Sequence, residues 1–359
     1  LFMVILWSAL IVLTVFVDPN QLKPTLINLV KAKTGYDLVL EDKLSWSLYP
    51  RLSITAPHAK LIEPVNQKVI LALQNVKWGV DLLAFWQKRE QTESQLSIEN
   101  AQYDTYFLGA IHANLLLDKG DVVLSPLSAD FAGGVLRGSI ALTPATHTLN
   151  YTLELQQAQM ASLWRQVNPD SAVSVSGTGD VSLHGQTSGA TKEERLANLQ
   201  GFLNWQINDG AIEGVDFNYY VQAAQAFVQH QALPEPGPYA ATRFSRFVGS
   251  GPINAGFFTL QTLQLDAPEF VLLGKGSVHL PAKQLDLAVR LQILNQNRWQ
   301  IPVLITGNWH RPDVRLDTAA IKEVLGKIEI ETLRTQAEEL IQKNVHGKTR
   351  EFLNTILGD

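Results

Sequence analysis

The sequence contains no cysteine and comparatively few charged residues. Without cysteine the chain cannot form disulfides, a cysteine zinc site or a cysteine nucleophile. This absence does not assign a compartment, because both an oxidising periplasm and the cytosol tolerate cysteine-free proteins. Charged residues make up 18% of the 359 residues, the net charge is −5 and no basic block is present. The composition therefore indicates a globular protein and argues against nucleic acid as a partner.

Motifs of common catalytic and metal sites are missing as well. The eight histidines are scattered, and no two of them stand at the spacing of metal ligands. The chain has no Gly-x-Ser-x-Gly elbow, no Walker loop and no Gly-x-Gly-x-x-Gly after a strand, and residues 249–252 are interpreted as a loop. The sequence thus predicts no catalytic residues, no metal and no cofactor. A hydrolase built on paired carboxylates stays an alternative, because pairs of Asp or Glu become visible only in three dimensions.

The first 17 residues carry no charge. Seventeen helical residues span about 26 Å at ~1.5 Å per residue, close to the ~30 Å of a bilayer core. We interpret them as a single transmembrane anchor, and because the chain begins at Leu1 rather than Met, we expect residues upstream to complete the span. A cleaved signal peptide is the alternative, although no small-x-small cleavage site precedes Asp18.

Strict alternation of apolar and polar residues dominates the middle of the chain. It predicts strands with one apolar and one wet face, and short turns such as residues 281–283 predict an antiparallel meander. Residues of one parity in separate strands should face one concave surface: Tyr151, Leu153, Val175, Val181, Leu272, Leu287, Val289 and Val303.

Such a sheet must cover its apolar face, and few helices are predicted to do so. The spacing of apolar residues predicts helices over residues 19–33 and 218–231, a short one over 82–91, and a helical tail from about residue 318. Two covers are therefore possible: the sheet curls on itself, or something else fills the face. Gly177 and Gly179 would either leave room in such a trough or mark a simple strand bend.

The N-terminal pattern has several parts in a fixed order. Residues 17–20 read Val-Asp-Pro-Asn, Lys23-Pro24 and Thr34-Gly35 follow, and a first strand ends near Pro50. In this order they resemble the N-terminus of the AsmA family, envelope proteins of Gram-negative bacteria. One departure is Asp42, where many members carry Gly before the first strand.

The C-terminal half resembles the same family. Asn208 to Asp216 is similar to the family's Asp-Gly-Ala-Ile-x-Gly-x-Asp step into a helix, residues 301–314 to its Ile-Pro-Val-x-Ile-x-Gly closing strand, and residues 274–278 to its Gly-x-Gly turn. Residues 60–165 resemble the family only in that they read as alternating strands. The resemblance implies the fold of chorein-type bridge proteins, in which a curved sheet forms a trough with an apolar interior. It also implies a role in phospholipid movement toward the outer membrane, with the eight residues named above contacting acyl chains.

The resulting hypothesis is a mainly β protein: an elongated, curled antiparallel sheet with an N-terminal transmembrane helix and a helical C-terminal tail. We expect an anchor over residues 1–17, β regions over 18–165 and 166–317, and an amphipathic tail over 318–359. The resemblance places the anchor in the inner membrane and the bulk of the chain in the periplasm, with phospholipids as partners. The tail would cap the last edge strand, or contact the outer membrane or an envelope protein. The alternative function is a non-enzymatic assembly factor for outer membrane proteins.

Overall fold

The computed structural model describes residues 18–47, 52–79, 91–118, 120–228, 231–232, 234–235, 240–294 and 300–321. The predicted anchor (1–17), most of the predicted helix over 82–91 and nearly all of the predicted tail lie outside these residues. Within them, no helix is both long and apolar enough to cross a membrane. The last described residues begin a helical turn at Thr318, where the Asp317 carboxylate accepts a hydrogen bond from the Ala320 amide (3.0 Å), as an N-cap does.

The helix predicted over residues 19–33 is present and leads into the first strands. Asp18 accepts a hydrogen bond from the Asn20 amide (2.9 Å), which caps the 3₁₀ helix η1 (Pro19–Leu22), and α2 (Lys23–Thr34) follows and ends at Gly35 with φ 77°. The hydrogen bonds from the backbone and the side chain of Asn20 to the Asp18 carboxylate lower its pKa. The Asn20 side chain also bonds both backbone groups of Leu44. The Asp-Pro-Asn step therefore turns the chain and ties the helix to the sheet.

The predicted antiparallel meander is confirmed as one 19-stranded sheet, in which every pair of strands is antiparallel. The strands of its first half are β1 (Asp37–Leu40), β2 (Ser45–Ser47), β3 (Ser53–Ile62), β4 (Val69–Gly79), β5 (Gln91–Tyr103), β6 (Tyr106–Asp118), β7 (Asp121–Phe131), β8 (Gly134–Thr143) and β9 (Thr148–Gln159). Those of its second half are β10 (Ser174–Val175), β11 (Thr178–Ser188), β12 (Gln200–Glu213), β13 (Ala241–Asn254), β14 (Phe257–Leu260), β15 (Thr262–Asp266), β16 (Phe270–His279), β17 (Gln284–Ile293), β18 (Gln300–Asn308) and β19 (Asp313–Leu316).

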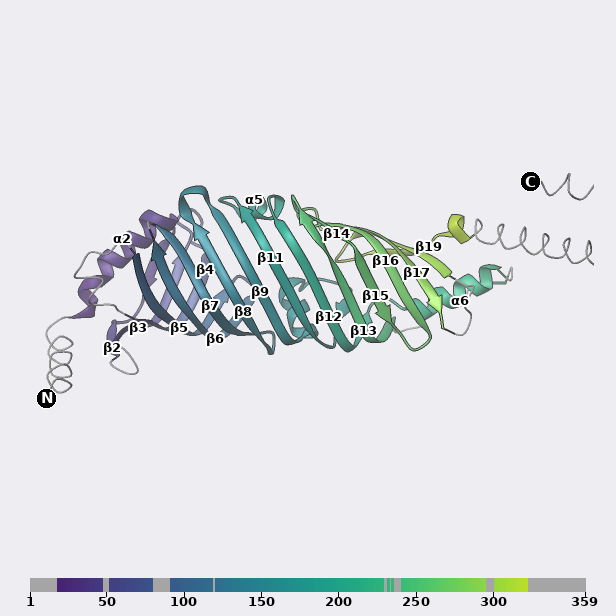
Figure 1. Cartoon of the computed structure of the whole chain (residues 1–359), viewed down its shortest axis with the longest axis horizontal. Helices are drawn as coiled ribbons and strands as arrows, with labels where there is room; N and C mark the ends of the chain where they lie inside the picture. Colours follow the sequence, from purple (N-terminus) through teal and green to yellow (C-terminus); the bar gives the residue numbers. More distant parts are fainter. Residues whose placement is uncertain are drawn as a thin grey trace, which may run out of the picture.

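The sheet is elongated, with α2 near one end and α6 (Phe217–Val228) near the other (Figure 1). From β3 to β9 each strand pairs with the next one in sequence, and β9 then pairs with β11. Two strands are interrupted: β10 and β11 both pair with β12, and β14 and β15 both lie between β13 and β16. The division predicted between residues 165 and 166 falls inside α4 (Met160–Val167), and one sheet runs through both predicted β regions.

The registers place apolar residues of successive strands side by side. One row runs through Leu136, Leu155, Val181, Trp205 and Gly249, from β8 to β13. Because directly paired residues share a face of the sheet, these registers make the apolar positions one continuous surface.

The strand ends and turns on either side of the sheet form two rims. The sheet curls strongly enough for these two rims to meet. Lys192, at the rim where β11 turns into β12, forms an ion pair with Asp104 at the opposite rim, between β5 and β6 (3.5 Å). Farther along, the Ala172 amide beside β10 bonds the carbonyl of His310, which lies at the opposite rim after β18 (2.8 Å). Each contact joins elements several strands apart in the sheet. The sheet therefore covers part of its apolar face by itself.

Irregular residues within the strands bend the sheet. Register shifts occur at Ala110, at Pro126 and at Gln157, and Ala110 and Gln157 have φ of 42° and 53°. Such bulges bend a strand and increase its twist. They also shift the inward parity by one residue, which explains why residues 60–165 show the alternation less clearly in sequence.

Several local expectations were wrong. The helices α4 and α5 (Lys192–Ala197) lie where none was predicted, and residues 249–252 belong to strand β13 rather than to a loop. Helix α6 is present where a helix was predicted over residues 218–231, and its buried side chains include Phe217 and Ala223.

The two glycines do not leave room in a trough. A Cβ on Gly179 would lie 2.5 Å from the Gln206 carbonyl oxygen, and one on Gly177 would lie 2.7 Å from that of Asn208. Both glycines are therefore required by the close approach of β12, and Gly177, with φ 115°, sits at the break between β10 and β11.

This close approach predicts the effect of adding one methyl group. We expect Gly179→Ala to lower the free energy of unfolding by about 1–3 kcal/mol, because the new Cβ overlaps the backbone of β12. Gly109→Ala is the matched control, since its Cβ would meet only ordinary contacts, the nearest at 3.6 Å. Urea unfolding of both variants measures the difference, and equal stability of the two would contradict the steric argument.

Candidate functional site

The apolar face of the sheet has two sections that differ in burial. The open section consists of the inward side chains of β4–β9, β11 and β12, where many large residues are half-buried, although Ile98, Ile111, Leu127, Leu155 and Ile207 are at most 9% exposed. The closed section consists of the inward side chains of β13–β19, where the central residues are 0–8% exposed. The half-buried residues of the open section include Leu73, Leu96, Leu108, Leu124, Leu136, Ile140, Leu153, Val181, Leu183 and Leu203.

Small and large residues alternate across the open section. Ala113 lies between Leu96 and Leu127 in register, and Ala129 lies beside Leu136. The alanines are at most 6% exposed, whereas Leu96 and Leu136 remain half-buried. Among the described inward positions of β4–β9 there is no charged side chain. The result is an apolar surface with no ionic group, on which small buried residues lie between larger, partly exposed ones.

Helix α6 covers the closed section. Phe217 is 3% exposed and its ring meets that of Phe270 edge to face, with centroids 6.4 Å apart. The Phe217 amide donates to the Thr242 hydroxyl (2.9 Å), which in turn donates to the Val215 carbonyl (2.8 Å). The turn into α6 is thus held by a buried and fully paired hydroxyl, so that the helix begins directly over the sheet.

The Tyr220 side chain joins α6 to the far edge of the sheet. Its hydroxyl donates to the carbonyl of Val314 in β19 (2.8 Å). Burial raises the pKa of Tyr220, and the neighbouring Tyr219, Asp313 and Asp216 raise it further. This contact and the Ala172–His310 hydrogen bond close the section at the same end.

Helix α4 and the β5–β6 turn form a second closure, nearer the open section. The Gln166 backbone carbonyl accepts from the Thr105 hydroxyl, and its side-chain oxygen accepts from the Phe107 amide, both at 2.8 Å. The Trp164 indole donates to the Val173 carbonyl (2.7 Å). The Lys192–Asp104 pair is 57% and 41% exposed, so it contributes little stability by itself.

The eight residues predicted to line one surface all lie on the apolar face, but in different surroundings. Leu153 and Val181 are half-buried in the open section, and Tyr151, there too, is 7% exposed with its hydroxyl bonded to the Gln200 carbonyl. Leu287 is half-buried in the closed section. The remaining four are at most 7% exposed within the large buried cluster: Val175, Leu272, Val289 and Val303.

Sequence reasoning missed most of the open section. Leu108 and Leu124 belong to β6 and β7, whose register shifts at bulges, so their alternation is broken in the sequence. Residues 136–142 carried a usable signal, because Leu136, Ile140 and Leu142 alternate with Arg137, Ser139 and Ala141.

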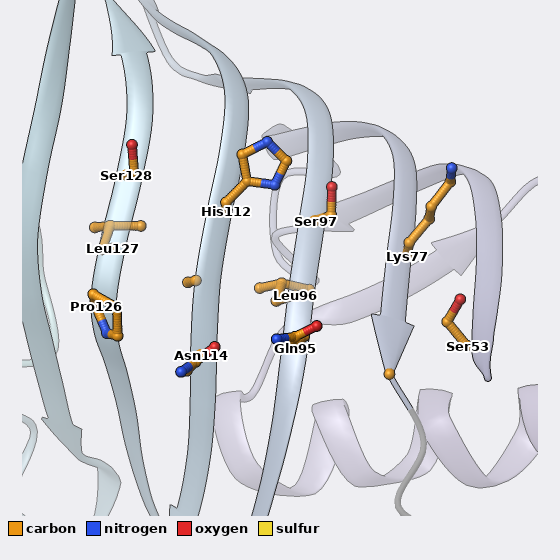
Figure 2. A pocket seen from close by; sticks show the side chains of 12 residues that line it. Ser53, Lys77, Gln95, Leu96, Ser97, His112, Asn114, Pro126, Leu127 and Ser128 are labelled. Atoms are coloured by element: carbon orange, nitrogen blue, oxygen red, sulfur yellow. The ribbon is translucent and has the colours of Figure 1, made fainter. Parts of the chain in front are cut away.

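A hollow of about 470 Å³ lies over β3–β7, and its lining combines polar residues with Leu96, Ala113 and Leu127 of the open section. Figure 2 shows its lining residues on neighbouring strands. Lys77, Ser97, His112 and Ser128 are paired in register, so they share the face opposite to Leu96 and Ala113. No group of His, Asp or Glu in the described part of the chain could hold a metal ion.

Comparison with known proteins identifies the family. The sequence model of the AsmA family matches residues 1–94 and 81–263. The chain belongs to the AsmA family. Protein AsmA of Escherichia coli (strain K12) is 22% identical over 243 residues, which is 66% of this chain. The chain spans only 37% of the length of that relative, and no solved structure matches it.

The matched residues revise the extent of the resemblance. Residues 60–165, which were expected to resemble the family only as alternating strands, lie within the match. The Gly-x-Gly turn at residues 274–278 and the closing strand at 301–314 lie beyond its end at residue 263. The open section therefore falls within the part of the chain that the AsmA family model describes.

The Tyr220 contact gives a testable pH dependence. The folded protein holds this phenol proton more tightly than the unfolded chain, whose tyrosines titrate near pH ~10. Its contribution is therefore complete below that pH and is lost as the pH rises through the higher folded-state pKa. Tyr220→Phe should cost about 0.5–1.5 kcal/mol at neutral pH and should weaken the loss of stability above pH ~10.

Urea unfolding at neutral and alkaline pH measures both effects. Tyr103→Phe is the control, because Tyr103 is 39% exposed on β5 and should change stability little. A Tyr220→Phe variant with unchanged stability and an unchanged alkaline profile would show that this hydroxyl does not hold the closure.

Proposed function

We propose that this protein binds the acyl chains of phospholipids along the open section and conducts them in the periplasm, in support of outer membrane lipid homeostasis and assembly. The observation that carries the proposal is an uncharged apolar surface, continuous over several strands, on which leucines such as Leu96, Leu136 and Leu153 remain half-buried. A folded chain rarely leaves such a surface without an occupant, because each methylene removed from water is worth about 0.8 kcal/mol. Membership of the AsmA family supports an envelope role.

The dimensions of the open section suit an acyl chain. Eight strands, β4–β9, β11 and β12, give seven intervals of ~4.8 Å, or about 34 Å across the strands. One leaflet contributes about 15 Å of a ~30 Å hydrocarbon core. An acyl chain of ordinary length would therefore occupy part of the section, with its headgroup at a rim, and the section could hold more than one chain along its length.

Location and partners complete the proposal. Residues 1–17 would anchor the protein in the inner membrane as a single pass, with the bulk of the chain in the periplasm. The residues after 321 would contact the outer membrane or an envelope protein. The function is binding and conduction without catalysis, and it requires no metal or cofactor.

Two adjacent residues on opposite faces of β8 test lipid binding. Ile140 pairs with Tyr151 on the apolar face, and Ser139 pairs with Thr152 on the polar face. A photocrosslinking amino acid at position 140 should capture phospholipid in cells, and one at position 139 should not. Mass spectrometry of the adducts identifies the captured molecule.

The same pair gives matched charge variants. Ile140→Asp should reduce the phospholipid that co-purifies with the protein, because an unpaired carboxylate on an apolar surface costs several kcal/mol once lipid covers it. Ser139→Asp should leave the amount unchanged. Circular dichroism and thermal melting check that both variants fold.

The competing function is an assembly factor whose apolar face is covered by an outer membrane protein. It predicts protein adducts rather than lipid adducts at position 140. It also predicts that lipid extraction of the purified chain yields no phospholipid. Either result, with the fold intact, would reject lipid conduction.

A further inference from the structure

The open section ends at one side chain, Trp205 in β12. Along the row of paired residues, Leu136, Val181 and Trp205 are half-buried, whereas Leu155 between Leu136 and Val181 is 5% exposed. The next positions beyond Trp205 are Gly249 and Leu263, which is 8% exposed. In the strands that follow, Val289 and Val303 are 1% and 0% exposed. Beyond Trp205, the large side chains of this row as far as β18 are therefore all buried, whereas Val181 and Trp205 itself are half-buried.

The indole of Trp205 lies directly on strand β13. A Cβ added to Gly249 would lie 2.0 Å from the indole Cζ2 atom and 2.3 Å from Cη2. Gly249 is therefore required because the ring occupies the space where any other residue would place its side chain. Gly249, which was interpreted as part of a loop, is instead the strand residue against which the indole ring of Trp205 packs.

An aromatic cluster supports the ring from the closed side. Phe247 meets it edge to face with centroids 5.7 Å apart, and Phe258 lies 5.9 Å away. Phe244 in turn packs on Phe247 at 5.7 Å. These rings occupy the volume into which an acyl chain would otherwise continue along the row.

No hydrogen bond holds the indole in place among the described residues. Its Nε1 atom is buried and has no partner there, so the position of the ring is set by packing alone. A substitution by Phe or Leu would therefore strand no polar group that depends on Trp205, which makes the residue suitable for a clean test.

We infer that Trp205, seated on Gly249, is the end stop of the acyl-chain site and sets how far along the sheet a bound chain reaches. The inference rests on the proposed function, since it assigns a specificity-determining residue to the same site. An acyl chain too long to end before Trp205 would bind less well, because its last methylenes would have to leave the apolar surface.

A phosphatidylcholine with a photoreactive diazirine at the end of one acyl chain tests this inference. The full chain is incubated with vesicles containing this lipid in a series of chain lengths, illuminated, and the labelled residues are mapped by mass spectrometry. In the natural protein, labels should reach Leu203 and Trp205 but should be absent from Leu263 and Val289. In Trp205→Ala and Trp205→Leu, labels should extend to Leu263, and longer chains should bind relatively better.

Trp78→Ala is the matched control, because Trp78 lies on the same face at β4, within the open section. It should leave the boundary at β12 unchanged. If Trp205→Ala does not fold by circular dichroism, Trp205→Leu and Trp205→Phe decide the question with a smaller loss of packing. Labels at Leu263 or Val289 in the natural protein, or an unchanged boundary in the folded Trp205 variants, overturn the end stop. A complete lack of labelling in the natural protein instead overturns the proposed lipid binding.

Discussion

An antiparallel sheet with one apolar face must cover that face, and the rest of this structure depends on how it does so. The chain uses two covers that differ along its length. Over β13–β19 the sheet curls and helix α6 closes the interior, so that Val303 and Leu291 have no exposed surface. Over β4–β12 several leucines of the same face, such as Leu96 and Leu153, stay half-buried beside buried ones such as Leu127 and Leu155. One continuous surface is therefore a packed core at one end and a candidate binding surface at the other.

Curvature comes from specific residues rather than from a uniform bend. Bulges at Ala110 and Pro126 shift the register of β6 and β7, and glycines such as Gly138 and Gly185 stand where an added Cβ would overlap a neighbouring carbonyl oxygen. These devices bring opposite rims together, where Asp104 meets Lys192 and Ala172 meets His310. The contacts at the rims are few and partly exposed, whereas the closed section is dense. Stability thus resides mainly in the closed section, and the open section is free to carry function.

Two chemical properties of the apolar face matter for binding: the absence of charge and the pairing of its polar atoms. Charged side chains lie outside it in the described strands β4–β9, so a bound apolar group would meet no ionic partner there. The polar atoms that the face does contain are mostly paired, as for Tyr151 with Gln200 and Trp78 with Ser94. Trp205 differs, because its indole nitrogen is buried without a partner and its ring is held by Gly249 and the neighbouring phenylalanines. It stands at the point where the two sections meet.

The sequence by itself determined the strands near residues 149–156, 173–184 and 270–293, their antiparallel order and the inward parity of residues such as Leu153 and Val289, because alternation at period two reflects a sheet with one wet face. It also determined the helix that ends at Gly35 and the helix near residue 218. Only the tertiary structure decided which inward residues are sealed and which remain accessible, because sealing depends on contacts between rims several strands apart and on where α6 lies. The same holds for the glycines: the sequence left open whether Gly179 made room or a bend and placed Gly249 in a loop, while the close approach of β12 to Gly179 and of the Trp205 ring to Gly249 shows that the space is already filled.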